Sequence, residues 1–242
     1  MKLGHYQFSP PLLAFLSAIF LSALFAGLGR WQIDRMHQKE EIIAQYQQRQ
    51  AEPATDRLPS PSADLEEWRY RQVQLNGRLL AERQFLLDNQ ISGGRVGFNV
   101  LTPMALEGGN TVLVDRGWVA MGARREDLPD VRLTADPNTI SGTIYVPFGE
   151  PFALGNATIG EVGWPRIVQY LDFKALGDLL GTPLLPMVVR LSPQQAGGYK
   201  REWSLIAMSA DKHLAYAVQW FGLAAVPMIL LLVLNIKRSD ER

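Results

Sequence analysis

Two long apolar runs, one near each end, set the hydrophobic pattern of this chain. Leu214 to Ile236 holds 23 residues without a charge, and Ser9 to Gly29 is a second uncharged run. Because a helix rises roughly 1.5 Å per residue, the C-terminal run is about 35 Å long, slightly more than the hydrocarbon core of a bilayer. The pattern therefore predicts transmembrane helices at residues 9–29 and 214–236.

The residues that follow the first run predict a helix that continues beyond the bilayer. Residues 30–52 are mostly good helix formers and include no proline, so we expect a helical extension there. Pro53, Pro59 and Pro61 then break the pattern, which predicts an irregular linker over residues 53–67.

From Trp68 onward the pattern changes to short apolar runs that are typical of β-strands. Alternating and β-branched residues, separated by glycine-rich turns, predict an antiparallel meander within residues 68–203. Asn76-Gly77, inside the first of these runs, predicts either a tight turn or a bulge. We expect the strands to form a barrel or a strongly curved sheet, since closure removes exposed sheet edges.

Two further segments are placed by their end signals. The charged, proline-bounded stretch from Arg124 to Pro137 is expected to be a loop. Asp172 is expected to cap a short helix that Gly181 ends. Together these features predict an α+β membrane protein in which two transmembrane helices flank a β-rich, antiparallel, barrel-like extracytoplasmic domain.

Charge predicts which side of the membrane holds this domain. Basic residues flank each run on the side nearest its chain terminus, and those after the second run are Lys237, Arg238 and Arg242. The positive-inside rule then places both termini in the cytoplasm and the middle domain in the periplasm. Basic residues also follow the first run, but they open a long loop, which translocates largely regardless of charge. The N-terminus resembles neither a cleaved signal peptide nor a mitochondrial presequence, so we expect a bacterial inner-membrane anchor.

Composition narrows the chemistry. The chain has no cysteine, which excludes disulfides, thiol catalysis and thiolate metal ligation. Its 24 Lys and Arg balance 24 Asp and Glu, so there is no basic field for nucleic acid. Motifs of serine hydrolases, zinc proteases and phosphate-binding loops are missing, and none of the three histidines lies in the β-rich part. We therefore expect a protein that is not an enzyme.

The most unusual residues stand where the second span begins. On a helix, His213, Tyr216, Trp220 and Ala224 fall on one face. A neutral imidazole there could ligate a heme iron, with His213 as the metal ligand and Tyr216 and Trp220 against the porphyrin. The other interpretation is an interfacial belt, because Trp, Tyr and His favour the headgroup zone. The residue pattern alone favours the belt.

Arg116, Gly117 and Trp118 close one of the predicted strands. Strand alternation places Arg116 and Trp118 on the same side of the strand, two residues apart. In a structural interpretation Arg116 stacks on Trp118 or pairs with a neighbouring acid. In a functional interpretation it contacts a partner or a propionate-type carboxylate. The pattern favours the structural interpretation.

Several of these motifs, taken together, resemble those of a known family. A Gly-x-Trp-Gln-x-x-Arg element follows the first span at Gly29, Trp31, Gln32 and Arg35, an RGWV element begins at Arg116, and HLAYAVQW opens the second span at His213. From about Gly29 to Ala225 the chain resembles the Surfeit locus protein 1 family of cytochrome oxidase biogenesis proteins.

The resemblance implies a role in assembling heme-copper cytochrome c oxidases within respiratory chain biogenesis. Family members are associated with delivery of heme a to the large oxidase subunit, or with stabilisation of that subunit in a chaperone-like role. By position, His213 matches the histidine suggested to meet heme, and Trp220 matches its aromatic neighbour.

The same resemblance names the expected partners and cofactor. They are the membrane, the large subunit of cytochrome c oxidase, heme a synthase as a second candidate partner, and heme a as a transiently bound cofactor. Two alternatives stay open. One is a cofactor-free docking or structural protein of a respiratory complex, and the other, with less support, is an anchored periplasmic enzyme.

Overall fold

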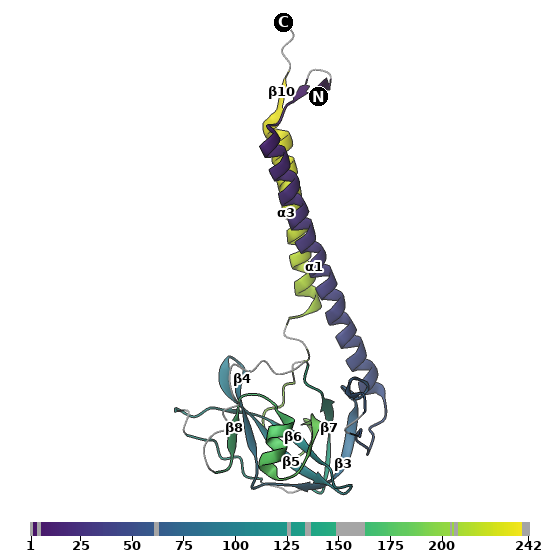
Figure 1. Cartoon of the computed structure of the whole chain (residues 1–242), viewed down its shortest axis with the longest axis vertical. Helices are drawn as coiled ribbons and strands as arrows, with labels where there is room; N and C mark the ends of the chain where they lie inside the picture. The colour runs from purple at the N-terminus through teal and green to yellow at the C-terminus, as the bar shows by residue number, and fades with distance from the viewer. Residues whose placement is uncertain are drawn as a thin grey trace. The chain divides into compact units, whose positions relative to one another are not determined.

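The chain folds into two compact units (Figure 1). One unit consists of Met1–Gln45 with Ser204–Arg242, and the other is Tyr46–Trp203. The computed structural model describes residues 2–3, 6–60, 63–124, 127–133, 137–148, 163–203, 205 and 208–238. Parts of the predicted linker and of the loop predicted at 124–137 therefore lie outside the described residues.

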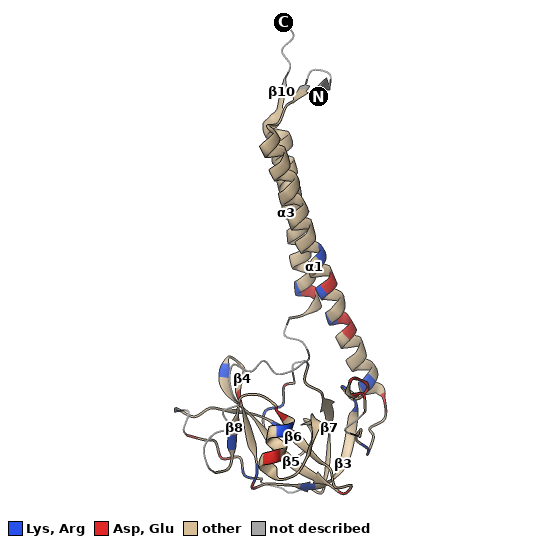
Figure 2. Cartoon of the chain, in the orientation of Figure 1, with Lys and Arg blue, Asp and Glu red and all other residues tan. Residues whose placement is uncertain are grey.

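The first unit is a pair of long helices. Helix α1 runs from Leu12 to Ala51, so the predicted first span and its extension form one helix, whose last turns belong to the second unit. Helix α3 runs from Ala210 to Asn235. Both helices are long and apolar enough to cross a membrane. Figure 2 shows no charged residue in the N-terminal half of α1 or along most of α3.

The two helices pack antiparallel along a seam with a heptad-like spacing. Gln32 meets His213, Phe25 meets Trp220, and the Ser9 amide donates to the Asn235 carbonyl at 3.3 Å. The covered positions recur at alternating steps of four and three, as in coiled-coil packing. They are Ala18, Ser22, Phe25, Gly29, Gln32 and Met36 on α1, and His213, Ala217, Trp220, Ala224, Pro227 and Leu231 on α3.

A small sheet joins the two ends of the chain in this unit. Its strands are β1 (Lys2–Leu3), β2 (Tyr6–Phe8) and β10 (Ile236–Arg238), with β2 in the middle and both pairings antiparallel. The sequence pattern did not predict these short strands, because neither terminus shows a run of alternating residues.

The second unit contains a closed five-stranded barrel. Its strands are β3 (Gln72–Leu79), β4 (Phe85–Ser92), β5 (Arg95–Leu106), β6 (Thr111–Ala120), β7 (Thr139–Tyr145), β8 (Arg166–Val168) and β9 (Leu184–Leu191). They lie in the order β3-β7-β9-β6-β5-β4-β8, and β3 also pairs with β5. That pairing closes β3, β7, β9, β6 and β5 into a ring, which confirms the predicted β-rich, barrel-like domain between two membrane-spanning helices.

The sheet is mixed rather than purely antiparallel. Strands β4, β5 and β6 form the predicted antiparallel meander, but β6 pairs with β9 and β4 pairs with β8 in parallel. Parallel neighbours need long connections, and the segments that lead to β8 and β9 provide them. The local patterns at 166–171 and 186–193 predict strands without showing their direction.

Barrel closure depends on a glycine where a turn or bulge was expected. Strand β3 runs unbroken through Asn76 and Gly77, so the expected tight turn is wrong. Asn76 still pairs with Thr139 of β7, whereas Gly77 pairs with Leu106 of β5. A Cβ at Gly77 would lie 2.3 Å from the Ala105 carbonyl oxygen, so only glycine permits this approach of two backbones.

The core fills the barrel and the space beneath one helix. Val73, Val114, Ile144, Met187 and Val189 are among the buried residues of the barrel interior. A second cluster packs under helix α2 (Phe173–Leu180). A short 3-10 helix, η1 (Leu65–Trp68), precedes the barrel.

The caps of α2 are those that the sequence predicts. The Asp172 carboxylate accepts from the Ala175 amide at 2.9 Å, and Gly181 ends the helix with φ of 72°. This short helix and its two end signals are confirmed.

Candidate functional site

His213 lies in the first turns of α3 and faces α1. The side chain is 8% exposed, and its Nδ1 lies 2.7 Å from Oε1 of Gln32. Because an amide oxygen only accepts, Nδ1 is the donor in this contact, and in the neutral imidazole Nε2 would carry the lone pair. Nε2 has no hydrogen-bond partner within the described residues. It is also not completely buried, so it can be reached from outside the helix pair. One ring nitrogen is therefore held and the other is available.

The element after the first span divides into an inner and an outer pair. Gly29 and Gln32 are buried against α3, and a Cβ at Gly29 would lie 2.9 Å from the ring of Phe221. Trp31 is 50% exposed, and the Arg35 guanidinium lies over it, 5.7 Å from the ring centroid. The inner pair packs the helices and holds His213, while the outer pair faces away from the seam.

The aromatic residues of α3 also differ in their placement. Trp220 is partly buried and stacks on Phe25 of α1, with ring centroids 5.8 Å apart and an interplanar angle of 24°. Tyr216 is 47% exposed and lies outside the seam, where Ala217 takes the covered position. The structure therefore brings His213 and Trp220 onto the covered face, and it leaves Tyr216 on the flank of the helix.

The Arg-Gly-Trp element forms a β-bulge. In the pairing of β6 with β5 the register shifts, and Arg116 and Gly117 together face Val100. Gly117 has φ of 111°, and a Cβ there would lie 2.7 Å from the Lys200 carbonyl oxygen. Glycine is needed here for both the backbone conformation and the space.

Arg116 is almost completely buried, and its donors are used. Its Nε donates to the Gly197 carbonyl at 2.8 Å, and its Nη1 donates to Gln84 Oε1 at 2.8 Å and to the Val131 carbonyl at 3.1 Å. The guanidinium also lies over the ring of Tyr199, 5.0 Å from the centroid. Burial lowers the pKa of Arg116, and Tyr199 opposes this effect.

The predicted stacking of Arg116 on Trp118 is therefore wrong. The bulge shifts strand alternation by one residue, so the two side chains do not share a side as they would on a regular strand. The Trp118 indole instead donates to the Gln90 carbonyl at 2.9 Å. Arg116 binds its own domain, which agrees with a structural role, although its partners differ from those expected.

Sequence reasoning missed one residue with unusual surroundings, Arg190 on β9. The signal was present, because a charged residue stands inside the apolar run PMVVRLSP. Its Nε is a buried atom without a hydrogen-bond partner. Neither Arg190 nor the buried carboxylate of Asp115 beside it had been selected as a candidate.

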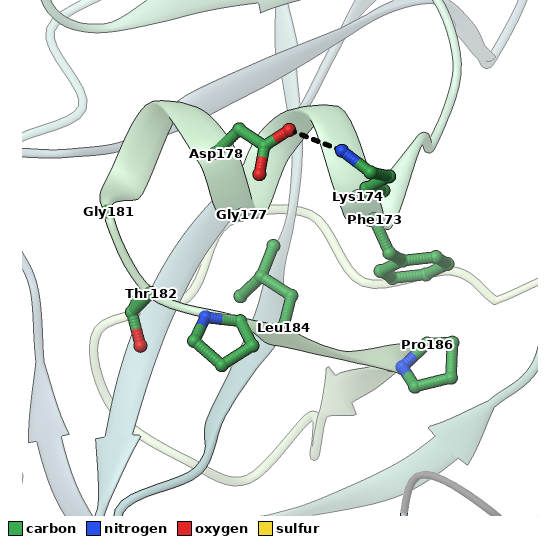
Figure 3. A pocket seen from close by; sticks show the side chains of 9 residues that line it. Phe173, Lys174, Gly177, Asp178, Gly181, Thr182, Leu184 and Pro186 are labelled. Carbon is green, nitrogen blue, oxygen red and sulfur yellow. Dashed lines mark hydrogen bonds and ion pairs between the residues drawn. The ribbon is translucent and has the colours of Figure 1, made fainter.

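The surface of the barrel unit also carries an open groove beside α2 (Figure 3). The groove has a volume of about 640 Å³ and lies between α2 and the start of β9. Lys174 and Asp178 form an ion pair of 2.8 Å on its helix side. Within the described residues no three His, Asp or Glu side chains gather as metal ligands. The groove thus offers apolar surface and one exposed ion pair.

Comparison with known proteins identifies the relatives of this chain. The model of the SURF1 family matches residues 19–225. A SURF1-like protein of Drosophila melanogaster is 29% identical over 235 residues, which covers 88% of this chain and 74% of the relative. An uncharacterized SURF1-like protein of Mycobacterium bovis is 26% identical over 218 residues, covering 88% and 79%.

A vertebrate relative shows the same extent of similarity. Surfeit locus protein 1 of Takifugu rubripes is 24% identical over 227 residues, which covers 86% of this chain and 90% of the relative. The region matched by the family model includes most of α1, the barrel, the first part of α3 and all the motifs described above. This chain is a membrane protein that belongs to the SURF1 family of cytochrome oxidase assembly factors.

Proposed function

We propose that this protein assists assembly of a heme-copper cytochrome c oxidase by holding heme a at His213 for the large subunit. The observation that carries the proposal is the contact of 2.7 Å between Nδ1 of buried His213 and Oε1 of Gln32. Metal-ligating histidines almost always donate their second ring nitrogen to an oxygen acceptor, which fixes the ring and raises its basicity. Gln32 provides this acceptor from the opposite helix.

The neighbouring residues suit a flat apolar ligand. Trp220 and Phe25 present stacked rings about two helical turns from His213, on the side of the seam toward the apolar run. When bound, heme a would supply an iron with a coordination position for Nε2 and a large apolar macrocycle. His213 would hold the iron, Gln32 would orient His213, and Trp220 and Phe25 would contact the macrocycle.

We also propose the orientation of the chain. Both termini lie in the cytoplasm of a bacterium, α1 and α3 cross the inner membrane, and the barrel lies in the periplasm. The basic residues that flank each apolar run on the side of the chain terminus support this orientation. A reporter active only in the cytoplasm, fused to either terminus, should be active, and an inactive reporter would contradict the orientation.

The barrel is proposed to dock on the nascent oxidase rather than to catalyse a reaction. Buried Arg116 is engaged within the fold, and this agrees with a binding module. Deletion of the gene should lower the heme a content and activity of the oxidase. Normal oxidase in the deletion strain would contradict the assembly role.

Heme retention is tested on the full chain purified from cells that make heme a. We expect the wild type to carry heme absorbance and the His213→Ala variant to show at most a tenth of it, since the nitrogen that would hold the iron is removed. His37→Ala is a matched control, because His37 is an exposed histidine on α1. Absence of heme in the wild type, or equal heme in His213→Ala, would rule out the ligand role.

The contact between His213 and Gln32 also supports a second function, docking without a cofactor. A hydrogen bond between His213 and Gln32 also fastens α3 to α1 without any ligand. In that case the protein would co-purify with oxidase subunits and carry no heme, and His213→Ala would loosen the helix pair. The heme measurement above separates the two functions.

A further inference from the structure

Three polar residues form a row across the outer face of the barrel. Arg190 of β9 pairs with Thr143 of β7 on one side and with Asp115 of β6 on the other. Their strand neighbours Ile144 and Val189 belong to the barrel interior, so the row points away from it. A cation in the middle of three strands is thus presented on the outside of the barrel.

Aromatic rings surround this cation. The Arg190 guanidinium lies 3.8 Å from the ring centroid of Tyr145 and 5.2 Å from that of Trp203. Trp203 is held in place by its indole, which donates to the Leu191 carbonyl at 3.4 Å. Rings on the faces of a guanidinium leave the N–H donors at its edge as its remaining polar surface.

A strained residue stands at the same place. Tyr70 is buried and has φ of 67°, a left-handed conformation that is unfavourable for a bulky side chain. Its ring meets that of Tyr46 edge-on at 5.6 Å, and its carbonyl accepts from Gln50 at 3.0 Å. The Tyr70 amide donates to the Ile144 carbonyl at 2.9 Å, next to Thr143, the strand partner of Arg190. Burial raises the pKa of Tyr70, and the charges on Arg69 and Arg190 oppose this effect. Strain of this kind concentrates at ligand sites.

The donors of half-buried Arg190 have no acceptor among the described residues, unlike those of the buried arginines Arg69 and Arg116. Arg116 gives its hydrogen bonds to Gly197, Gln84 and Val131, and Arg69 donates to Glu66 and to the Val146 carbonyl. For Arg190, by contrast, the described residues provide neither a hydrogen-bond acceptor nor an ion pair, and its Nε is buried. Arg190 is half-buried, and a buried Nε–H without an acceptor is costly, so an acceptor supplied from outside would remove that cost.

Asp115, the nearest acid in the row, is turned to other partners. Its Oδ1 accepts from the Gly117 amide at 3.0 Å, and its Oδ2 accepts from Asn99 at 2.8 Å. Asp115 makes no ion pair with Arg190 within the 4.0 Å limit among the described residues. Asp115 offsets part of the Arg190 charge without a direct contact, so the N–H donors of Arg190 stay available.

We propose that Arg190, flanked by Tyr145 and Trp203, is the anchor of a binding site for a carboxylate. The planar fork of a guanidinium matches a carboxylate through two parallel hydrogen bonds, and aromatic flanks hold the fork in one orientation. The site lies in the barrel unit and does not depend on heme at His213, so it goes beyond the function proposed above.

The test uses the full chain in detergent micelles with ¹⁵N-labelled arginine. The Nε–H resonance of Arg190 is identified by its loss in Arg190→Lys, and that of exposed Arg78 by its loss in Arg78→Lys. Sodium propionate is the probe, propionamide is its uncharged analogue, and inorganic phosphate is the competing anion. All titrations are made at constant ionic strength.

We expect a saturable shift of the Arg190 resonance with propionate, half-complete at a concentration at least tenfold below that for phosphate. Propionamide should cause no saturable shift, and Arg78 should respond linearly at most. Trp203→Leu, which leaves the Arg190 fork intact, should raise the half-saturation concentration at least threefold. A resonance that does not saturate with propionate, or that saturates first with phosphate, would overturn the assignment.

Discussion

The helix pair and the barrel both bury polar side chains, but they use them differently. In the helix pair, His213 gives one ring nitrogen to Gln32 and keeps the other. In the barrel, Arg116 gives its donors to three acceptors, while Arg190 on the parallel neighbouring strand gives none to the described residues. Burial alone therefore does not mark a site. The informative feature is a buried polar group whose bonding capacity is partly unused.

The largest expected effect separates the two arginines of the barrel. Arg116→Ala should destabilise the barrel by about 4 kcal/mol, because three acceptors lose their donor and a buried cavity is left. Arg190→Ala should cost only about 1 kcal/mol, since it removes the contacts with Tyr145 and Trp203 but no hydrogen bond. Denaturant unfolding of the full chain, followed by far-UV circular dichroism, measures both, with Arg78→Ala as the exposed control. Equal costs for Arg116→Ala and Arg190→Ala would contradict the distinction.

The second effect concerns Asp115, which lies between the two arginines. Burial raises its pKa from 3.8 to about 6, against the Gly117 amide, Arg190 and Asn99, which lower it. The folded state thus holds the proton more tightly than the unfolded chain. The resulting stability is present below about pH 4 and is lost as the pH rises through about 6, a total of about 3 kcal/mol.

The variant Asp115→Asn isolates this effect, because it keeps the shape and removes the charge. We expect the unfolding free energy of the wild type to fall between pH 4 and pH 7 relative to that of the variant. Denaturant titrations at each pH provide the comparison. Parallel curves for the two proteins would show that Asp115 is not kept protonated by its surroundings.

The sequence predicted the helix pair better than the barrel. Uncharged runs of the right length specify membrane helices, and the motif residues Gly29, Gln32, His213 and Trp220 lie on the covered faces of α1 and α3. The sequence places Tyr216 on the same helix face as His213, because the spacing from His213 was the only guide to that face. The position of the partner helix, which sequence periodicity does not contain, selected Ala217 instead.

The barrel depended on long-range pairings that local patterns do not specify. The strands were predicted from alternation, but the parallel pairing of β6 with β9 joins segments that are far apart in the chain. The bulge at Gly117 reversed the expected side of Arg116, since one extra residue shifts alternation. Arg190 was overlooked for a related reason, because only the folded sheet places it beside Tyr145 and Trp203.

The third effect concerns the helix pair and the retention of heme at His213. Gln32→Leu should weaken retention of heme by about 10- to 100-fold, since it removes the acceptor that orients His213. Gln32→Glu should restore retention, because a carboxylate oxygen also accepts from Nδ1. Gln45→Leu, at an exposed position of α1, is the control.

A second readout for Gln32 does not require heme. The ¹⁵N shifts of the His213 ring report its tautomer, with hydrogen on Nδ1 in the wild type and a mixture of tautomers in Gln32→Leu. If the two proteins showed the same tautomer, Gln32 would be a packing residue only.

The smallest effect tests whether close packing at Gly29 positions this pair. A Cβ at Gly29 would lie 2.9 Å from the Phe221 ring, which is 46% exposed and so has room to move. Gly29→Ala should therefore cost only about 1 kcal/mol, and Phe221→Ala in the same chain should recover most of it, as expected for overpacking at one contact.

Because the chain has no cysteine, a Phe25→Cys, Trp220→Cys pair measures the approach of the helices through its rate of disulfide formation. A rate that Gly29→Ala leaves unchanged would mean that His213 is positioned by Gln32 alone, without help from the spacing of the helices.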